Sequence, residues 1–278
     1  MKGVILCADD FAVHERASLA IVQLATLGRL SATSAMVLSP HWPQHVALLQ
    51  DLRGRIDVGL HLDWTSEFAV LGGHGMALPG AMFKAALGGF GRGVAATVTR
   101  GVIERQLDAF EAQWKAPPDF VDGHQHVQQF AGIRDALVQA LISRYGTDSG
   151  PGLSRGRKPY LRISRAACGT ANLKSRVIAA MGASALERMA NDAGLPVASA
   201  LLGVYDFSGD QAHYARLMGG WLSAAPAGCI IMCHPAQDAQ PGDAIGLARA
   251  QEFAYLSSTD FTAALARARV ELVRGAGR

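Results

Sequence analysis

The chain has 278 residues, of which 50% are hydrophobic and 18% are charged, so it can bury a large core in one large domain or two small ones. Its formal net charge of +3 is too small to indicate a nucleic-acid partner. The basic residues are scattered apart from Arg155, Arg157 and Lys158, which we interpret as a solvated loop rather than a phosphate site. We therefore expect no nucleic acid among the ligands.

The N-terminal apolar run, Val4 to Ala8, is too short for a signal peptide and stops at two aspartates. No segment reaches the ~18 uncharged apolar residues that a membrane span requires. Cys229 and Cys233 would lie roughly 13 Å apart on one strand, too far for a disulfide. Buried reduced thiols suit them and the other two cysteines, Cys7 and Cys168. These features predict a cytoplasmic protein.

Short apolar runs alternate with amphipathic segments along the whole chain. The expected strands lie at 3–8, 32–38, 56–61, 120–121, 160–163, 228–233 and 270–273. The expected helices lie at 14–28, 43–52, 95–115, 132–144, 172–193, 211–224, 246–256 and 260–267. This alternation predicts an α/β fold with a largely parallel sheet.

The number of βα units favours a closed or partly closed barrel over an open sheet. No glycine-rich nucleotide-binding motif follows the first strand. Nothing divides the chain, so we expect a single domain over 1–278. A glycine-rich insertion at 72–93 interrupts the alternation, either as a lid over the substrate or as a mobile insertion. A polar loop at 146–158 is a second interruption.

Polar residues stand at the ends of the expected strands, where the chemistry of such barrels takes place. Asp9 and Asp10 end the first strand, so one carboxylate could bind a metal while the other faces the bound water. One of them could instead cap the following helix. His61 ends the third strand after Gly59, which permits a close backbone approach. His61 could also be structural, and Asp63 is a weaker candidate on the same side.

The segment from Asp122 to His126 carries the most specific pattern. His124 and His126 are one residue apart, which puts both imidazoles on one side of an extended segment, a common spacing for metal ligands. Asp122 could orient one imidazole from behind. A polar turn is the alternative interpretation.

His234 and Arg162 follow two further apolar runs. Pro235 stops the strand and fixes the position of His234, whose imidazole suits a general acid. Arg162 could pair with a catalytic carboxylate and lower its pKa, or it could be an ordinary surface arginine. Separate strand ends thus deliver acids and imidazoles, as a metal-dependent hydrolase requires. No role is expected for the remaining histidines, His14, His41, His45, His74 and His213.

In order and spacing, these motifs resemble the YdjC-like carbohydrate deacetylases, which include the chitooligosaccharide deacetylases and a branch associated with hopanoid biosynthesis. The resemblance covers most of the chain. Its markers are Ala8-Asp9-Asp10-Phe11, Thr33-Ser34-Ala35-Met36-Val37, Gly59-Leu60-His61-Leu62, Asp122-Gly123-His124-Gln125-His126-Val127, Leu161-Arg162 and Met232-Cys233-His234-Pro235-Ala236.

The resemblance implies a distorted or incomplete (β/α) TIM-like barrel related to the polysaccharide deacetylases. It implies that one divalent ion, Mg²⁺ or Zn²⁺, is held by Asp10, His61 and His124. Asp9 would be the general base and His234 the general acid. The further site residues expected are Arg162 in the catalytic set, and Phe11, Asp122 and His126 at the substrate or behind the ligands.

Two departures from the family pattern stand out. The family usually continues Asp-Asp-Phe-Gly, whereas Ala12 follows Phe11 here and His14 replaces a small polar residue. The third motif often ends His-Val-His, whereas this chain has His126-Val127-Gln128. Both changes spare the implied metal ligands and bear on substrate contacts.

The expected activity is removal of the N-acetyl group from an acetylated amino sugar, carried on an oligosaccharide or a glycolipid. A metal-dependent phosphoesterase is a second hypothesis, which would usually need a second metal. A non-catalytic carbohydrate-binding protein on the same barrel is a third, although binding alone needs no acid/base pair. A homodimer is compatible with the sequence.

Overall fold

A computed structural model describes residues 1–146, 158–167 and 169–275. Its sheet runs in the order β5-β4-β3-β2-β1-β7-β6, and every recorded strand pair is parallel. Most of the loop expected at 146–158, and Cys168, lie outside the described residues. The strands are β1 (Lys2–Phe11), β2 (Ala32–Ala35), β3 (Asp57–Leu62), β4 (Phe120–Gly123), β5 (Tyr160–Leu161), β6 (Leu201–Leu202), β7 (Ile230–Cys233) and β8 (Val270–Leu272).

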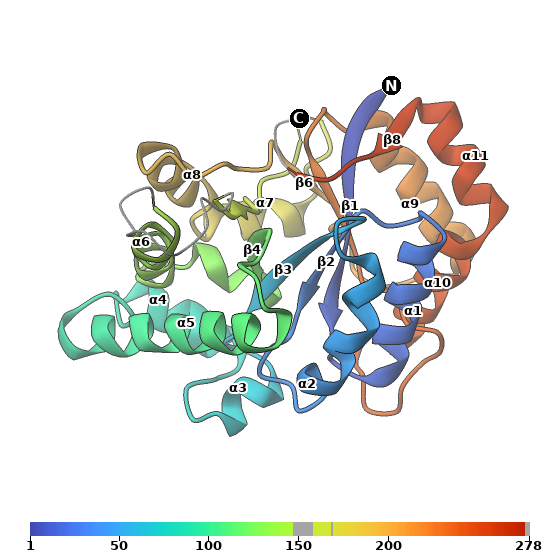
Figure 1. The fold of residues 1–278 in the computed structure, drawn as a ribbon. Coiled ribbons are helices and arrows are strands. Elements are labelled where there is room, and N and C mark those ends of the chain that lie inside the picture. The colour runs from blue at the N-terminus through green and yellow to red at the C-terminus, as the bar shows by residue number, and fades with distance from the viewer. Residues whose placement is uncertain (147–157, 168, 276–278) are drawn as a thin grey trace.

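The two ends of this sheet come together. Leu161 in β5 forms a parallel bridge with Val197, just before β6, while β6 pairs with β7. β8 lies outside this ring and pairs with the first residues of β1. The expected distorted α/β barrel is therefore confirmed, and the carboxyl ends of β1, β2 and β3 point to one side of it (Figure 1).

Helices surround the barrel (Figure 1). No helix in the described part of the chain is long and apolar enough to cross a membrane. The helices are α1 (Glu15–Thr26), α2 (Trp42–His45) with the 3₁₀ turn η1 (Val46–Leu52), α3 (Glu67–Leu71), α4 (Leu78–Ala86), α5 (Gly93–Trp114), the 3₁₀ segment η2 (His124–Gln129), α6 (Ile133–Tyr145), α7 (Leu173–Ala180), α8 (Ala183–Asp192), α9 (Gln211–Ala224), α10 (Gly246–Ser257) and α11 (Thr259–Ala268).

Most expected elements are present, but α3 and η2 were not among them and three further regions differ. The helix expected at 172–193 is two helices, because the chain turns at Gly182 with a φ of 129°, where a side chain would strike the Gln129 carbonyl. The insertion at 72–93 contains α4, which has Pro79 in its first turn. β6 was not expected at all, because a two-residue strand leaves no periodic pattern.

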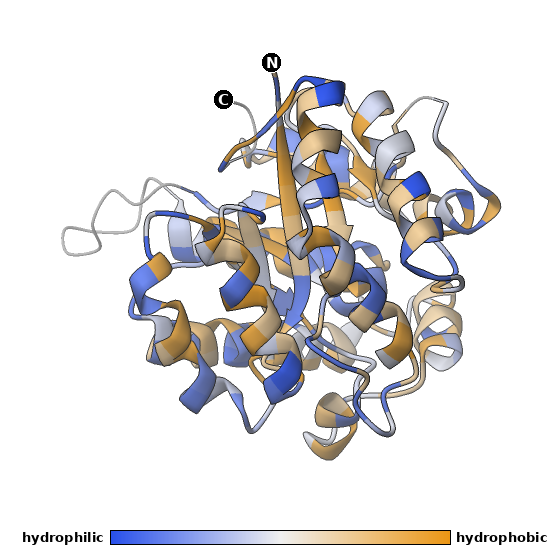
Figure 2. Cartoon of the chain, turned by 90° about the vertical axis from the view of Figure 1, so that its right-hand side faces the viewer, coloured by the Kyte–Doolittle hydropathy of each residue, from blue (hydrophilic) through white to orange (hydrophobic). Residues whose placement is uncertain are grey.

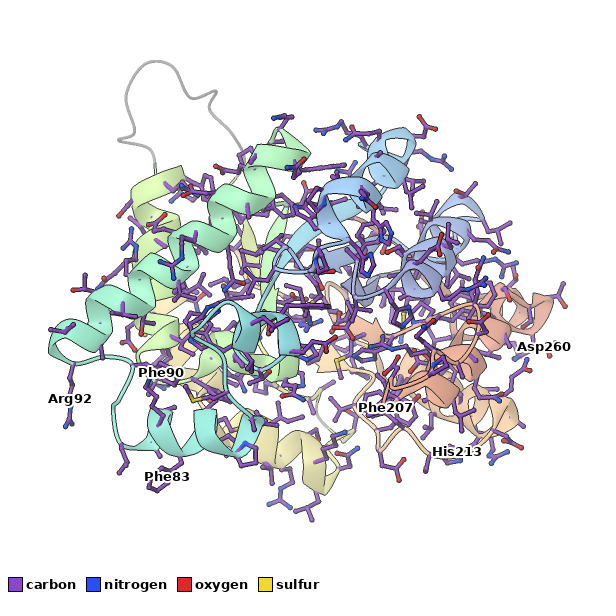
Figure 3. The ribbon with its side chains drawn as sticks, turned by 90° about the horizontal axis from the view of Figure 1, so that it is seen from below. Phe83, Phe90, Arg92, Phe207, His213 and Asp260 are labelled. Atoms are coloured by element: carbon purple, nitrogen blue, oxygen red, sulfur yellow. The ribbon has the colours of Figure 1, made fainter. Side chains whose placement is uncertain are left out.

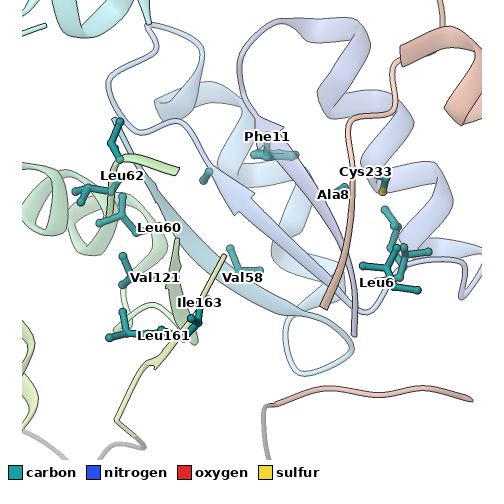
Figure 4. Packing of buried hydrophobic residues seen from close by; sticks show 14 of the residues in the cluster. Leu6, Ala8, Phe11, Val58, Leu60, Leu62, Val121, Leu161, Ile163 and Cys233 are labelled. Carbon is teal, nitrogen blue, oxygen red and sulfur yellow. The ribbon is translucent and has the colours of Figure 1, made fainter. Parts of the chain in front are cut away.

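Alternate residues of the strands serve two apolar clusters. Val4, Leu6 and Ala8 of β1 pack with residues from the helices, whereas Ile5 and Cys7 belong to a separate cluster in the barrel interior. Figure 4 shows the outward set on β1, β3, β4 and β5, and Figure 2 shows the hydrophobic residues concentrated along the strands. The described cysteines, Cys7, Cys229 and Cys233, are buried free thiols, as expected.

The interior positions change from apolar to polar toward the carboxyl ends of the strands. At the apolar level, Phe120 and Tyr160 stack with ring centroids 5.1 Å apart. A side chain at Gly59 would strike the Phe120 ring at 2.6 Å, which explains why this interior position is glycine. Two residues further along the chain, Asp122 on β4 and Arg162 directly after β5 take the interior positions, and both are fully buried. The fold thus builds a polar floor on top of an apolar barrel core.

Candidate active site

A β-bulge at the end of β1 turns two neighbouring carboxylates toward one cavity. The register with β2 moves from Ala8 opposite Thr33 to Phe11 opposite Ala35, so β1 gains one residue. Asp10 accordingly has a φ of 64°, in the left-handed region. Asp9 and Asp10 both line a cavity of about 1240 Å³ at the strand ends.

Neither aspartate caps the following helix. The cap of α1 is His14, whose Nδ1 accepts the backbone N–H of Ala17 at 3.1 Å. The helix-cap alternative for Asp9 and Asp10 is therefore wrong. His14, for which the sequence suggested no role, begins the helix and lines the cavity.

Asp10, His61 and His124 come together as a set of potential metal ligands. Asp10 Oδ1 lies 3.3 Å from His61 Nε2 and 3.2 Å from His124 Nδ1. The three ligand atoms all lie within 4.8 Å of one another. Two imidazoles and one carboxylate are a donor set that suits a divalent ion and leaves coordination positions for water and substrate.

His61 is held in place from behind. Its Nδ1 lies 2.6 Å from Asp122 Oδ1 and 3.0 Å from Ser34 Oγ, so the Nδ1 proton has acceptors and Nε2 faces Asp10. Burial opposes a charge on this imidazole, but the carboxylates of Asp122 and Asp10 raise the pKa of His61 to about 10. A cation bound at Nε2 would therefore lie in the negative potential of these carboxylates.

Arg162 is fully buried, so its interpretation as a surface arginine is wrong. Its Nη1 donates to Asp9 Oδ1 at 2.7 Å and lies 2.9 Å from Asp122 Oδ2. Burial opposes ionisation of Asp9, but the charge of Arg162, with those of His61 and His234, lowers the pKa of Asp9 to about 2. Asp9 is thus an ionised carboxylate at neutral pH.

A second group of potential ligands lies beside the first. Cys7, Asp9 and Asp122 also offer atoms within 4.8 Å of one another. Burial, reinforced by the negative charge of Asp9, raises the pKa of Cys7 well above its usual value, so the thiol stays protonated. Arg162 binds both carboxylates, so the positive charge of this group comes from the chain itself.

His234 reaches the site from the end of β7. Its Nε2 lies 3.8 Å from Asp9 Oδ2, and the ring meets the Phe207 ring edge to face at a centroid distance of 5.2 Å. Its backbone N–H donates to Glu252 Oε2 at 2.5 Å. Burial lowers the pKa of His234 to about 4 although Asp9 and Asp10 oppose this, so the imidazole is neutral at pH 7.

The chain matches the family model described as YdjC-like protein over residues 3–267. It belongs to the YdjC-like family. No sequence among the curated proteins matches it significantly.

Among solved structures, this YdjC-like chain is similar to a proposed cellobiose-phosphate cleavage protein from Enterococcus faecalis V583. The identity is 16% over 98% of this chain and 97% of that one, with a TM-score of 0.66, so the two share a fold. A T48 deacetylase with substrate (12% identity, 98% and 88% covered, TM-score 0.46) and a family 4 carbohydrate esterase from Streptomyces lividans in complex with acetate (12%, 98% and 91%, 0.43) are more distant.

Helix α10 of the YdjC-like chain supplies two site residues that the sequence analysis missed. Arg249 donates to Asp10 Oδ2 at 2.7 Å and to Asp243 Oδ2 at 2.7 Å, and His14 Nε2 lies 3.3 Å from the same Asp243 oxygen. Glu252 is fully buried. The available signal was periodicity: Arg249 and Glu252 lie on the same buried stripe of α10 as Leu256.

One other expectation for the YdjC-like site is wrong. Gln125 and His126 both have left-handed backbone angles, so the two histidines do not share one side of an extended segment. His126 lies with its Nδ1 3.0 Å from Ser164 Oγ, and burial, together with the charge of Arg162, lowers its pKa to about 3. It lines the cavity without joining the ligand set.

Phe11 and Asp63 are fully buried and do not line the cavity. Phe11 is buried in the core, edge to face with Trp42 at 6.3 Å, and does not line the cavity. Asp63 Oδ1 accepts the backbone N–H groups of Thr65 and Ser66 at 3.0 Å each, which fixes the turn before α3. Neither residue is placed to contact a substrate in the cavity.

The cavity has a polar floor and apolar walls. The insertion at 72–93 contributes Leu78 and Met82 from α4 to one wall. Helix α7 contributes Val177 and Ile178 to another, and Phe207 stands beside His234. The insertion therefore lines the cavity, which a lid over the substrate would also do.

Proposed function

We propose that this YdjC-like protein is a metal-dependent carbohydrate deacetylase that hydrolyses the N-acetyl group of an acetylated amino sugar. The observation that carries the proposal is that the neighbouring residues Asp9 and Asp10 have different surroundings. Asp10 stands with His61 and His124 as a ligand set, while Asp9 is held ionised between Arg162 and His234. A ligand set beside an acid/base pair is what amide hydrolysis at a metal requires.

A bound divalent ion would polarise the acetyl carbonyl and make a bound water more acidic. Asp9 takes a proton from the attacking water as the new C–O bond forms at the acetyl carbon. His234 is neutral beforehand, and its Nε2 lies 3.8 Å from Asp9, so it can receive this proton and pass it to the sugar nitrogen. The C–N bond then breaks, which gives acetate and the free amine.

The cavity limits the substrate class. Its polar floor suits the hydroxyl-rich sugar ring, and its apolar walls suit a second sugar ring or a hydrocarbon carrier. An oligosaccharide and a glycolipid both fit this description. Acetate release from N-acetylglucosamine, from chitobiose and from an N-acetylated glycolipid, each with Zn²⁺, Mg²⁺, Co²⁺ or Mn²⁺, separates them.

The two aspartates give the sharpest test of the proposal. Asp10→Asn is expected to lose both bound metal and acetate release, because a ligand is removed. Asp9→Asn is expected to keep the metal, measured by elemental analysis after dialysis, and to lose acetate release by ~10²-fold or more because the base is removed. Full activity in either variant would refute the assignment, and metal loss in Asp9→Asn would refute the division between them.

A further inference from the structure

Large apolar side chains are exposed around the opening of the cavity. They come from α3, from the insertion and from α7, and their exposed fractions range from 50% to 85%. Figure 3 shows α4 on this underside of the molecule with Phe83 pointing outward. We call this set the rim patch: Leu71 on α3, Phe83 on α4, Leu87 directly after α4, and Leu173 and Val177 on α7.

The rim patch is continuous with the interior of the cavity. Leu173 and Val177 line the cavity, yet they are 78% and 50% exposed. Leu78 and Met82 also line the cavity, and they come from the same helix that exposes Phe83. An apolar surface therefore runs from the outer face over the rim and into the site.

Apart from Glu67 at the start of α3, the segments that carry the rim patch have no negative charge. From 68 to 103 the chain has no aspartate or glutamate, but it has Lys84, Arg92 and Arg100. From 171 to 186 it again has no acid, but it has Lys174 and Arg176. The whole chain has 26 basic and 23 acidic residues, so this separation of charge is local. The nearest acid in sequence is Glu67, at the start of α3.

We propose that the rim patch docks on an anionic lipid surface, with α4 and α7 at the interface and the cavity opening toward the lipid. Exposed apolar side chains on short helices, flanked by basic residues, gain hydrophobic burial and electrostatic attraction together at such a surface. A second copy of the chain suits the patch less well. A two-fold interface here would bring Lys84 and Arg92 against basic residues of the same patch. The proposal does not depend on the catalytic assignment.

Co-sedimentation of the full chain with vesicles tests this docking. We expect more protein bound to mixed phosphatidylcholine and phosphatidylglycerol than to phosphatidylcholine alone, with less bound as salt rises. Phe83→Ser with Leu87→Ser should lower the partition coefficient on the order of tenfold. Lys84→Gln with Arg92→Gln should lower binding to the anionic vesicles about fivefold per charge and leave the neutral vesicles unchanged.

A matched control uses exposed aliphatic residues away from the cavity. Leu27 and Ile142 are 53% and 42% exposed, and neither lines the cavity, so Leu27→Ser with Ile142→Ser should bind like the unmodified chain. No binding of the unmodified chain to anionic vesicles would overturn the proposal, as would equal losses in the control. A dimer in sedimentation velocity that Phe83→Ser dissociates would assign the patch to a second copy instead. Acetate release from a soluble acetylated sugar, unchanged in the charge variant, separates docking from catalysis.

Discussion

Two groups of potential metal ligands lie side by side at the mouth of the barrel, and they differ in one respect. Asp10, His61 and His124 line the cavity, and Arg249 binds Oδ2 of Asp10 whereas the two histidines lie beside Oδ1. Cys7, Asp9 and Asp122 have equally close ligand atoms, but Arg162 lies between the two carboxylates. Spacing alone therefore does not define a cation site, because a guanidinium from the chain can occupy the place of the ion.

Asp122 is a member of the second group and also contacts the first. One of its oxygens lies beside His61 and the other beside Arg162. It therefore fixes the position of the ligand group relative to the group that holds Asp9 ionised. This shared carboxylate explains how neighbouring aspartates on one strand can be given different environments.

Replacing Arg162 should have the largest effect on this comparison. Arg162→Met leaves two buried carboxylates without their cation, so we expect the free energy of unfolding in urea to fall by about 3–5 kcal/mol. The loss of positive charge also raises the pKa of Asp9. If the comparison is right, this variant should bind additional Zn²⁺ at Cys7, Asp9 and Asp122, measured by calorimetric titration.

The matched control for this variant is Arg165→Met. Arg165 pairs with Glu187 at 2.6 Å but is 45% exposed, so its loss should cost about 0–1 kcal/mol and add no metal. Equal destabilisation by the two changes would show that the burial of the Arg162 ion pairs does not determine the loss of stability.

Glu252 extends the comparison to a buried carboxylate without an arginine bound to it. Burial raises its pKa from 4.5 to about 7, although Tyr205 and the backbone of His234 donate to it. Because the folded chain holds this proton more tightly, its contribution to stability is complete below pH 4.5 and is lost as pH rises through 7. We expect a loss of roughly 3 kcal/mol at about 1.4 kcal/mol per pKa unit.

Glu252→Gln keeps an acceptor for His234 and removes the titration. Urea unfolding of this variant and of the unmodified chain between pH 4.5 and 8 gives the difference that isolates Glu252. Parallel curves over this range would contradict a raised pKa.

Asp122→Asn tests the shared carboxylate. Loss of the charge behind His61 should weaken metal affinity about 10–100-fold, measured by competition with a chelating dye. Ser34→Ala removes the neutral hydroxyl at the same nitrogen, 3.0 Å away, and should have a smaller effect. If both changes act equally, the charge of Asp122 is not what supports the ligand group.

The smallest expected effect concerns the bulge that separates Asp9 from Asp10. Ala12 has a φ of 70°, in the region that favours glycine, and glycine is what the family usually has there. Ala12→Gly should therefore stabilise the fold by up to about 1 kcal/mol in thermal unfolding. Ala8→Gly, at a buried strand position without positive φ, should destabilise it by about 1 kcal/mol. Destabilisation by both changes would contradict strain at Ala12.

The sequence predicted the parts of the site that strands deliver. Asp9, His61 and Arg162 each follow an apolar run, and parallel strands bring such ends to one edge of a barrel. The resemblance to a family then assigned Asp10 and His124 as ligands, and the structure places both with His61. The positions of Asp9, His61 and Arg162 at strand ends follow from strand periodicity, whereas the assignment of the ligands came from the resemblance.

Contacts between distant segments were harder to predict. Arg249 reaches Asp10 across 239 positions, and no local pattern links them. The expected extended geometry of His124 and His126 was wrong, because Gln125 and His126 have left-handed backbone angles that the spacing of the two histidines does not reveal. In the sequence, Arg249 and Glu252 stand out only as charged residues on the stripe of α10 that is buried. Their partners cannot be predicted without knowing how this helix is oriented in the fold.

The barrel is closed by fewer strand hydrogen bonds between β5 and β6 than hold its longer strands together. β5 and β6 have two residues each, and Leu161 joins the segment before β6 through hydrogen bonds to Pro196 and Ala198 of 2.9 and 3.0 Å. Few bonds must break to part the barrel along this seam, so amide exchange should be fastest there. α7, which forms a cavity wall, lies between β5 and β6 in the chain, whereas Asp10 and His61 sit on the longer ladders of β1 and β3. The cavity wall formed by α7 can therefore move while Asp10 and His61 keep their relative positions.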